Sequence, residues 1–132
     1  MFDGDGKLLN IIKVDVPFDE AAAKPAIGNK PDISKCSTEG GTFCPGAPWA
    51  VCITPAPNQV LYTSDSYPGR IYKLSLDGKL LGVLGESGKQ PKQFGWVHEI
   101  ACPSENVLYV AEILNWRIQK LILKPGERAA SR

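Results

Sequence analysis

The sequence predicts an all-β fold in which one small antiparallel unit occurs more than once. The main observation is an internal repeat: residues 59–76, QVLYTSDSYPGRIYKLSL, return as residues 106–123, NVLYVAEILNWRIQKLIL, after a shift of 47 positions (106 − 59). The second observation is that short runs rich in β-branched and aromatic residues alternate with Pro, Gly, Asn and Asp turns, which is typical of antiparallel strands. A repeat that keeps its apolar positions and its turns indicates one structural unit that has been copied.

The first complete unit spans residues 48–85 and is expected to contain four strands. We expect these strands at residues 49–54, 59–64, 70–76 and 79–84. The Asp77-Gly78 pair favours a tight hairpin turn between the last two strands, because glycine accepts a positive φ without steric cost.

The second unit spans residues 86–123 and is expected to contain three strands. They are predicted at residues 96–101, 107–112 and 116–123. The fourth strand is missing because a Lys-Pro-Gly sequence follows and interrupts the pattern. Residues 124–132 are therefore interpreted as a polar tail.

The beginning of the chain contains part of a further unit. The pentad DGKLL occurs at residues 5–9 and again at residues 77–81, where it leads into the fourth strand of the complete unit. Residues 7–14 are therefore predicted to be the last strand of a truncated unit, which comprises residues 1–14. Residues 15–47 contain Pro or Gly every few positions and no sustained period, which indicates a long connecting loop.

Four short antiparallel strands in about 40 residues is the size of one blade of a β-propeller. The predicted fold class is therefore all-β, an incomplete propeller of about two and a half four-stranded blades. Propellers typically close with about four to eight blades, so open ends would expose strand edges and apolar faces. We expect either a fragment of a longer propeller or a chain that completes its ring by self-association, as a homo-oligomer.

The composition excludes several classes of function. The 132 residues are 43% hydrophobic and 22% charged, with a formal net charge of +1, as expected of an ordinary globular domain. This charge gives no basic excess for nucleic-acid binding, and no apolar run is long enough to span a bilayer. No signal-peptide pattern is found in this chain, so the sequence leaves open a cytosolic location or export directed by residues outside it.

The segment that joins the two units, with the strands after it, carries a motif. It reads G-x-x-G-x-x-P-x-x-F, then an apolar strand, then VLYVAE, an Asn and RIQK. These residues are Gly85, Gly88, Pro91, Phe94, residues 107–112, Asn115 and residues 117–120. The succession resembles the NHL repeat over residues 48–123 and partly over residues 2–14. The resemblance implies a β-propeller, usually six-bladed. The incomplete number of blades favours a binding or scaffold module, whose partner is a protein or peptide ligand or further blades.

Among NHL proteins, the chain resembles the peptidyl-α-hydroxyglycine α-amidating lyases, six-bladed zinc enzymes that complete the C-terminal amidation of peptides. Their Asp-x-Tyr…Arg-Ile turn corresponds to residues 64–71, SDSYPGRI, and their zinc-ligating His to VHEIA at residues 97–101. The resemblance implies Tyr67 as the catalytic tyrosine, His98 as a zinc ligand, and a secreted or periplasmic parent. The lyase zinc takes three histidines from different blades, whereas this chain contains one His. The alternative function is therefore a zinc-dependent lyase that is active only in a complete propeller.

The residues alone leave two interpretations of His98 and two of Tyr67. His98 lies on an expected innermost strand, as a metal ligand or as a neutral His held by hydrogen bonds. One His cannot complete a catalytic zinc site, which takes three protein ligands. Glu99 or Glu112 can supplement it, although strand alternation directs Glu99 to the face opposite His98. Tyr67 is either a general base or oxyanion partner near the channel mouth, or a turn residue that covers the edge of the blade.

Residues that occur at the same place in both units are predicted to be structural. They are Trp49 and Trp96, Asp65 and Glu112, and Arg70 and Arg117. Each arginine lies five positions after the acidic residue, so each is expected to pair with it and to brace the turn between the second and third strands. The tryptophans are expected to pack between blades.

The four cysteines form no CxxC pair and no zinc-ribbon spacing. Cys36 and Cys44 share one Gly-rich loop and can close a small disulfide if the protein is exported. Cys52 and Cys102 lie in or just after apolar strands, and we expect them to be buried free thiols.

Overall fold

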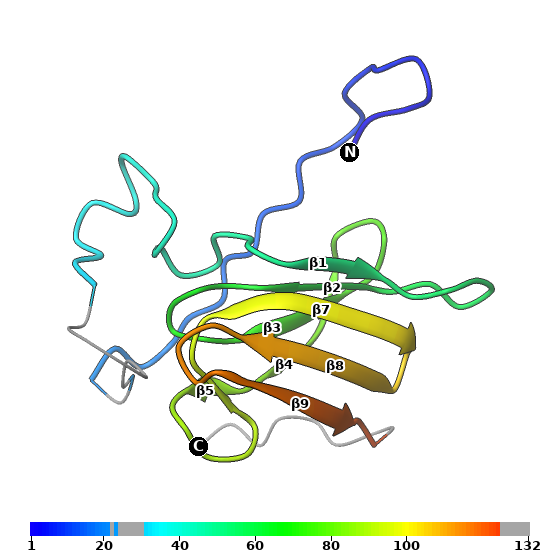
Figure 1. The fold of residues 1–132 in the computed structure, drawn as a ribbon. Helices are drawn as coiled ribbons and strands as arrows, with labels where there is room; N and C mark the ends of the chain where they lie inside the picture. The colour runs from blue at the N-terminus through cyan, green and yellow to red at the C-terminus, as the bar shows by residue number, and fades with distance from the viewer. Residues whose placement is uncertain (22, 24–30, 125–132) are drawn as a thin grey trace.

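The computed structural model describes residues 1–21, 23 and 31–124, and Figure 1 shows its fold. Within these residues the protein is all-β, with nine strands and no helix. Seven of the strands form two antiparallel sheets, and the other two form a short parallel pair. No helix in the described part of the chain is long and apolar enough to cross a membrane.

The first sheet is formed by the first complete repeat unit. Its strands, in spatial order, are β1 (Val51–Ile53), β2 (Leu61–Ser64), β3 (Ile71–Leu74) and β4 (Leu80–Leu84). All three pairings between neighbours are antiparallel. The strands fall within the ranges expected from the sequence, because Pro, Gly and Asp residues fix the turns between them.

The second sheet is formed by the second repeat unit. It contains β7 (Val97–Ser104), β8 (Val107–Glu112) and β9 (Arg117–Ile122), again antiparallel and in sequence order. The chain enters it through the parallel pair β5 (Glu86–Ser87) and β6 (Gln93–Phe94). β7 continues to Ser104, beyond the expected end at residue 101, with two irregularities in its pairing with β8.

The two sheets stack face to face (Figure 1). Paired residues share a face, so Tyr62 and Lys73 lie on the face of the first sheet that we call its front face. This face meets the second sheet: the Tyr62 hydroxyl donates to the Glu105 carbonyl oxygen over 2.6 Å. The hydrophobic core is the cluster of buried residues Ala50, Val60, Tyr62, Ile71, Phe94, Val97, Ile100, Cys102, Leu108, Val110 and Leu121. The described residues thus form a two-layer stack of sheets and no closed ring.

Residues 7–14 do not form the predicted strand. Within the described residues, this segment makes only an isolated antiparallel bridge between Phe2 and Leu8. The expectation was wrong because a strand requires a hydrogen-bonded neighbour along its length, and the turn at residues 3–7 brings only the chain start, Met1 and Phe2, into pairing with residues 8–10. Leu9 and Ile11 are consequently exposed.

Both pairs of cysteines form disulfides. The Cys36–Cys44 disulfide closes a small loop within residues 15–47. The second disulfide joins Cys52 of β1 to Cys102 of β7 across the two sheets, so the expectation of free thiols at these positions was wrong. Cys52 pairs with Tyr62 and therefore points from the front face toward the second sheet. Stacking of β1 on β7 brings Cys52 to Cys102. The sequence of either strand by itself does not predict this contact.

Removing the inter-sheet disulfide should destabilise the fold more than removing the loop disulfide. The two bridges span sequence separations of 50 and 8 residues. By restricting the unfolded chain, closure of these loops raises the free energy of the unfolded state by about 4 kcal/mol for the longer loop and about 2.5 kcal/mol for the shorter one. We expect Cys52→Ser/Cys102→Ser and Cys36→Ser/Cys44→Ser to lower the free energy of unfolding by these amounts in urea titrations. Equal losses of unfolding free energy in the two variants would contradict the larger contribution expected of the inter-sheet disulfide.

Candidate functional site

A buried carboxylate organises the turn between β2 and β3. Asp65 is 0% exposed. Its Oδ1 accepts hydrogen bonds from the backbone N–H groups of Gly69 over 3.1 Å and Arg70 over 2.7 Å. Its Oδ2 accepts from the Gly46 N–H, the Arg70 guanidinium and the Tyr72 hydroxyl. We call these residues the first carboxylate cluster.

The local sequence explains this turn. An Asp side chain readily hydrogen-bonds backbone N–H groups a few residues later, which stabilises a turn in place of a continuing strand. Gly69 completes the turn with a φ of 81°. A Cβ there would lie 3.0 Å from the Phe94 carbonyl oxygen, so both the conformation and the space favour glycine.

Arg70 connects the first carboxylate cluster to the long loop. Its guanidinium lies 3.3 Å from Asp65 Oδ2. Its Nη1 donates to the carbonyl oxygens of Val16 over 2.9 Å and Pro17 over 3.1 Å. The guanidinium also lies 5.3 Å from the centre of the Phe18 ring, at the range of a cation–π contact. Arg70 therefore attaches residues 16–18 to the start of β3.

The second unit contains the corresponding second carboxylate cluster. Arg117 Nε donates to Glu112 Oε1 over 2.7 Å. Gln119 Nε2 donates to the same oxygen over 2.8 Å, and Asn115 Nδ2 and the Gly95 N–H donate to Oε2. Both arginine–carboxylate pairs that the spacing predicts are therefore formed, and each carboxylate is surrounded by donors.

Arg117 holds the incoming loop in the same way as Arg70 does. Its guanidinium donates to the carbonyl oxygens of Lys89, Gln90 and Gln93. The shared DGKLL pentads relate residues 5–17 to residues 77–89 by a shift of 72 positions (77 − 5). This shift places Pro17 in correspondence with Lys89, so the two arginines bind the same position of two related segments.

These contacts shift the pKa of one group in each cluster. Burial opposes ionisation of Glu112, but its hydrogen bonds from Arg117, Gly95, Gln119 and Asn115 outweigh burial and hold its pKa below the ordinary value. In the first cluster, burial and the nearby Asp65 carboxylate raise the pKa of the Tyr72 hydroxyl. Tyr72 is therefore neutral at physiological pH and serves as a hydrogen-bond donor to Asp65.

The residues that complete the clusters were not identified from the sequence. Tyr72 and Gln119 both lie two positions after the arginine, and both donate to the carboxylate. A hydrogen-bond donor at this position in both units is the signal that could have revealed them. Tyrosine and glutamine otherwise differ in chemistry, so a comparison of the two units by residue type does not show that Tyr72 and Gln119 are equivalent.

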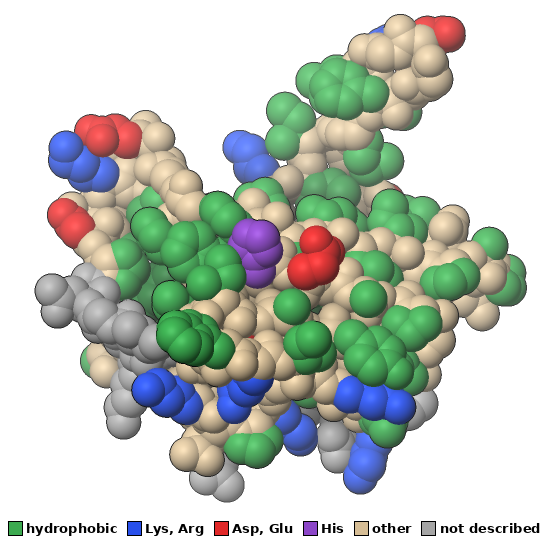
Figure 2. Space-filling model, in the orientation of Figure 1, with side chains coloured by type: hydrophobic (Ala, Val, Ile, Leu, Met, Phe, Trp, Pro, Cys, Tyr) green, Lys and Arg blue, Asp and Glu red, His purple; other side chains and the backbone are tan. Residues whose placement is uncertain are grey.

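His98 lies at the surface rather than in an enclosed channel (Figure 2). Val97 pairs with Glu112, and Glu99 pairs with Ala111, so His98 is the extra residue of a β-bulge. The bulge leaves both His98 and Glu99 exposed. Simple alternation of the strand, which was expected to direct Glu99 to the face opposite His98, is interrupted by this bulge.

Aromatic residues surround the first residues of the two innermost strands. The rings of Trp49 and Trp96 meet edge to face with centroids 5.0 Å apart. Phe43 of the long loop contacts Trp96, and the His98 ring lies 5.9 Å from the ring of Trp49. The tryptophans therefore contact each other where the two units meet, and His98 lies beside them.

Tyr67 lies in a different environment from His98. It is 2% exposed in the turn between β2 and β3. Its ring packs edge to face on Phe18 with centroids 5.9 Å apart. Phe18 also receives the Arg70 guanidinium, so Tyr67 is part of the packing that attaches the long loop.

The described residues do not assemble a metal site. Across residues 1–21, 23 and 31–124, no group of three or more His, Cys, Asp or Glu side chains is placed to hold a metal ion. Glu112 is engaged by its four donors.

No protein-family model matches the chain, and no curated protein matches it.

The second carboxylate cluster should stabilise the fold in a pH-dependent way. The pKa of folded Glu112 lies below its ordinary value of 4.5, so its stabilisation is present above about pH 4.5 and is lost as the pH falls through the folded-state pKa. We expect Glu112→Gln to lower the free energy of unfolding by about 1–3 kcal/mol at neutral pH. The difference from the unsubstituted protein should shrink in acid, as measured by urea unfolding. Glu86→Gln, at an exposed glutamate, is the control and should have little effect at either pH.

Proposed function

We propose that this chain is an NHL-type propeller segment that acts as a scaffold or binding module and packs against further blades. The observation that carries the proposal is a difference between the two sheets. The front face of the first sheet is covered by the second sheet, whereas the corresponding face of the second sheet is open.

Equivalent residues make the comparison direct. Tyr62 and Ile71 on the front face of the first sheet are each 1% exposed. Their counterparts after the 47-position shift, Tyr109 and Ile118, are 40% and 71% exposed. Ile122 of β9 pairs with Val107 on the same face and is also exposed. The second sheet thus carries an apolar face that no other sheet covers within the described residues, a feature typical of interaction surfaces.

The opposite side of the stack is partly open as well. We call the face of the first sheet that contains Val51, Thr63 and Tyr72 its back face. Thr63 and Tyr72 are buried, but Val51 and Ile53 of β1 are more than half exposed. Apolar faces at both ends of a stack are expected of a module that continues on both sides, because each repeat buries its surface against its neighbours.

The two carboxylate clusters give independent support for the repeat type. Each unit joins the strand 2–strand 3 turn to the segment that enters the unit, through one arginine and one acidic residue. Equivalent contacts at an identical place in two units favour a shared scaffold role. A unique catalytic role would require a residue that one unit has and the other lacks.

The zinc lyase is the second candidate, and exposed His98 is the observation that favours it. At the innermost strand, this imidazole can meet ligands from other blades or from another copy. Buried Tyr67 and the lack of a three-ligand group in the described residues favour the scaffold function instead.

The open face should mediate self-association. We expect the chain to associate in solution and Ile118→Asp to reduce association at least tenfold, because a charge would replace an exposed apolar contact. Since Ile118 is 71% exposed, this variant should keep its fold. The matched substitution Ile71→Asp should instead unfold the chain. Multi-angle light scattering and circular dichroism measure the two effects, and a stable monomer at all concentrations would refute the proposal.

Zinc analysis separates the two candidate functions. We expect purified protein to contain no stoichiometric zinc by mass spectrometry of the metal. His98→Ala should leave the affinity for added zinc unchanged, because one imidazole cannot hold the ion alone. Stoichiometric zinc that is lost in His98→Ala would favour the lyase.

A further inference from the structure

The second sheet has an open edge at β9. In the first sheet, β3 pairs with β4 along Ile71–Leu84 and its neighbours. β9 occupies the equivalent position of β3, but no strand pairs with its outer edge in the described residues. Residues 125–132, PGERAASR, contain no Leu, Ile or Val, so their sequence is unlike that of β4. An unpaired edge presents backbone donors and acceptors to any strand that can reach it.

The same chain carries a segment with the sequence of a fourth strand. Residues 5–12, DGKLLNII, correspond to residues 77–84, DGKLLGVL, which contain β4 and its preceding turn. In residues 5–12 this sequence forms no sheet, and Leu8, Leu9 and Ile11 are 50%, 58% and 65% exposed. We call residues 7–14 the orphan strand.

We propose that the orphan strand of one copy adds to β9 of a second copy as the fourth strand of its second sheet. The proposal rests on the proposed function, a module that packs against further blades, and it names the partner: another copy of this chain. The interaction is a β-augmentation, in which main-chain hydrogen bonds give affinity and alternate side chains give specificity.

The pairing of β3 with β4 supplies the register. Tyr72 pairs with Val83, and Lys73 pairs with Gly82. Shifting the β3 residues by 47 positions and the β4 residues by 72 places Gln119 opposite Ile11 and Lys120 opposite Asn10. This alignment therefore predicts which residues of the two copies face each other.

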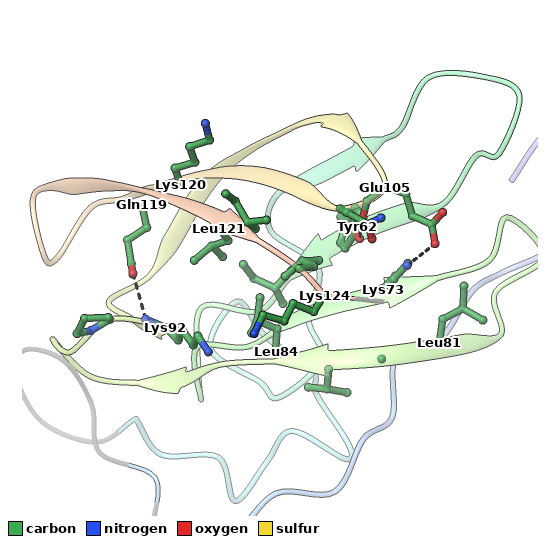
Figure 3. Close-up of a pocket in the computed structure, with 17 residues that line it drawn as sticks. Tyr62, Lys73, Leu81, Leu84, Lys92, Glu105, Gln119, Lys120, Leu121 and Lys124 are labelled. Carbon is green, nitrogen blue, oxygen red and sulfur yellow. Dashed lines mark hydrogen bonds and ion pairs between the residues drawn. The ribbon is translucent and has the colours of Figure 1, made fainter. Parts of the chain in front are cut away.

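A groove beside β9 fits the side chains of the added strand. It has a volume of about 760 Å³ and lies between the outer strands of the two sheets. Figure 3 shows Leu84 of β4 and Leu121 of β9 on its opposite sides. Leu74 pairs with Leu80 in the first sheet, so Leu8 would lie opposite Leu121, with Ile11 beside it on the groove side. Both side chains are largely exposed in the single copy and would become buried.

The exchange takes place between copies because the orphan strand is held on the far side of the first sheet. Arg70 binds the carbonyl oxygens of Val16 and Pro17, just after the orphan strand. The Arg70 guanidinium lies over Tyr72, a residue of the back face. In Figure 1 the N-terminal segment and β9 lie on opposite sides of the stacked sheets.

This location of the orphan strand also allows two contacts between copies at once: pairing of the orphan strand with β9, and packing of the open face of the second sheet on a first sheet. A second copy whose open Tyr109–Ile118 face packs on the back face of the first sheet would bring its own β9 toward the orphan strand. Each copy then contributes two complete four-stranded sheets. A ring of about four to eight such sheets therefore needs between two and four copies.

Disulfide trapping between two single variants tests the register. Asn10→Cys protein is mixed with Lys120→Cys protein, and the product is analysed by non-reducing electrophoresis and peptide mass spectrometry. All four native cysteines are in disulfides, so each new thiol is the reactive one. We expect a crosslink between positions 10 and 120. Lys13→Cys protein is the out-of-register control and should give little crosslink with Lys120→Cys protein.

A strand-breaking variant tests whether the orphan strand drives assembly. Ile11→Pro should weaken association at least tenfold, because proline cannot donate to a β-ladder, while Ile11→Val should associate as the unsubstituted protein does. Exposed Ile11 makes both variants compatible with the fold of the single copy. A synthetic peptide of residues 5–14 should also compete with assembly, and the same peptide with Ile11→Pro should not.

Each outcome has a defined meaning. Assembly that persists in Ile11→Pro, with no crosslink between positions 10 and 120, overturns strand exchange but leaves the scaffold function in place. A chain that stays monomeric at every concentration, with Ile118→Asp behaving like the unsubstituted protein, overturns both proposals.

Discussion

A sheet of three or four short strands cannot keep an apolar face in water, and this requirement organises the whole chain. Burial of one large aliphatic side chain contributes about 1.5–3 kcal/mol. The first sheet obtains this contribution on its front face from the second sheet, which encloses Tyr62 and Ile71. The second sheet has no such cover over Tyr109 and Ile118 within the described residues. In a single copy, the front face of the first sheet is therefore buried, whereas the corresponding face of the second sheet is not.

The two carboxylate clusters show how irregular segments are attached to such small sheets. Asp65 and Glu112 are buried, and a buried carboxylate is tolerated only when donors surround it. Each cluster uses its arginine to bind carbonyl oxygens of the segment that enters the unit. Arg70 thus holds residues 16 and 17, although no sheet contains them, much as Arg117 holds residues 89–93. This attachment explains how a segment without secondary structure can still have a defined location.

Features that depend on a short stretch of sequence were predictable. Features that depend on pairing with a second segment of the chain were not. The strand positions follow from alternating residues bounded by turns, and the pairs of Arg70 with Asp65 and Arg117 with Glu112 follow from a repeated spacing. The sequence pattern of residues 7–14 is that of a strand, but pairing is a property of two segments. The exposure of His98 depends on a bulge, which one extra residue in the pairing creates.

The bond between Cys52 and Cys102 gives the stacked sheets a property that repeat proteins usually lack. In most repeat arrays, neighbouring units are joined by weak contacts alone, so a terminal unit can unfold while the rest remains folded. Here the innermost strands of both units are covalently joined across the core. The two sheets therefore cannot separate from each other at β1 and β7 while this bond is intact. This bond holds the second sheet against the first even though the Tyr109–Ile118 face of the second sheet is exposed.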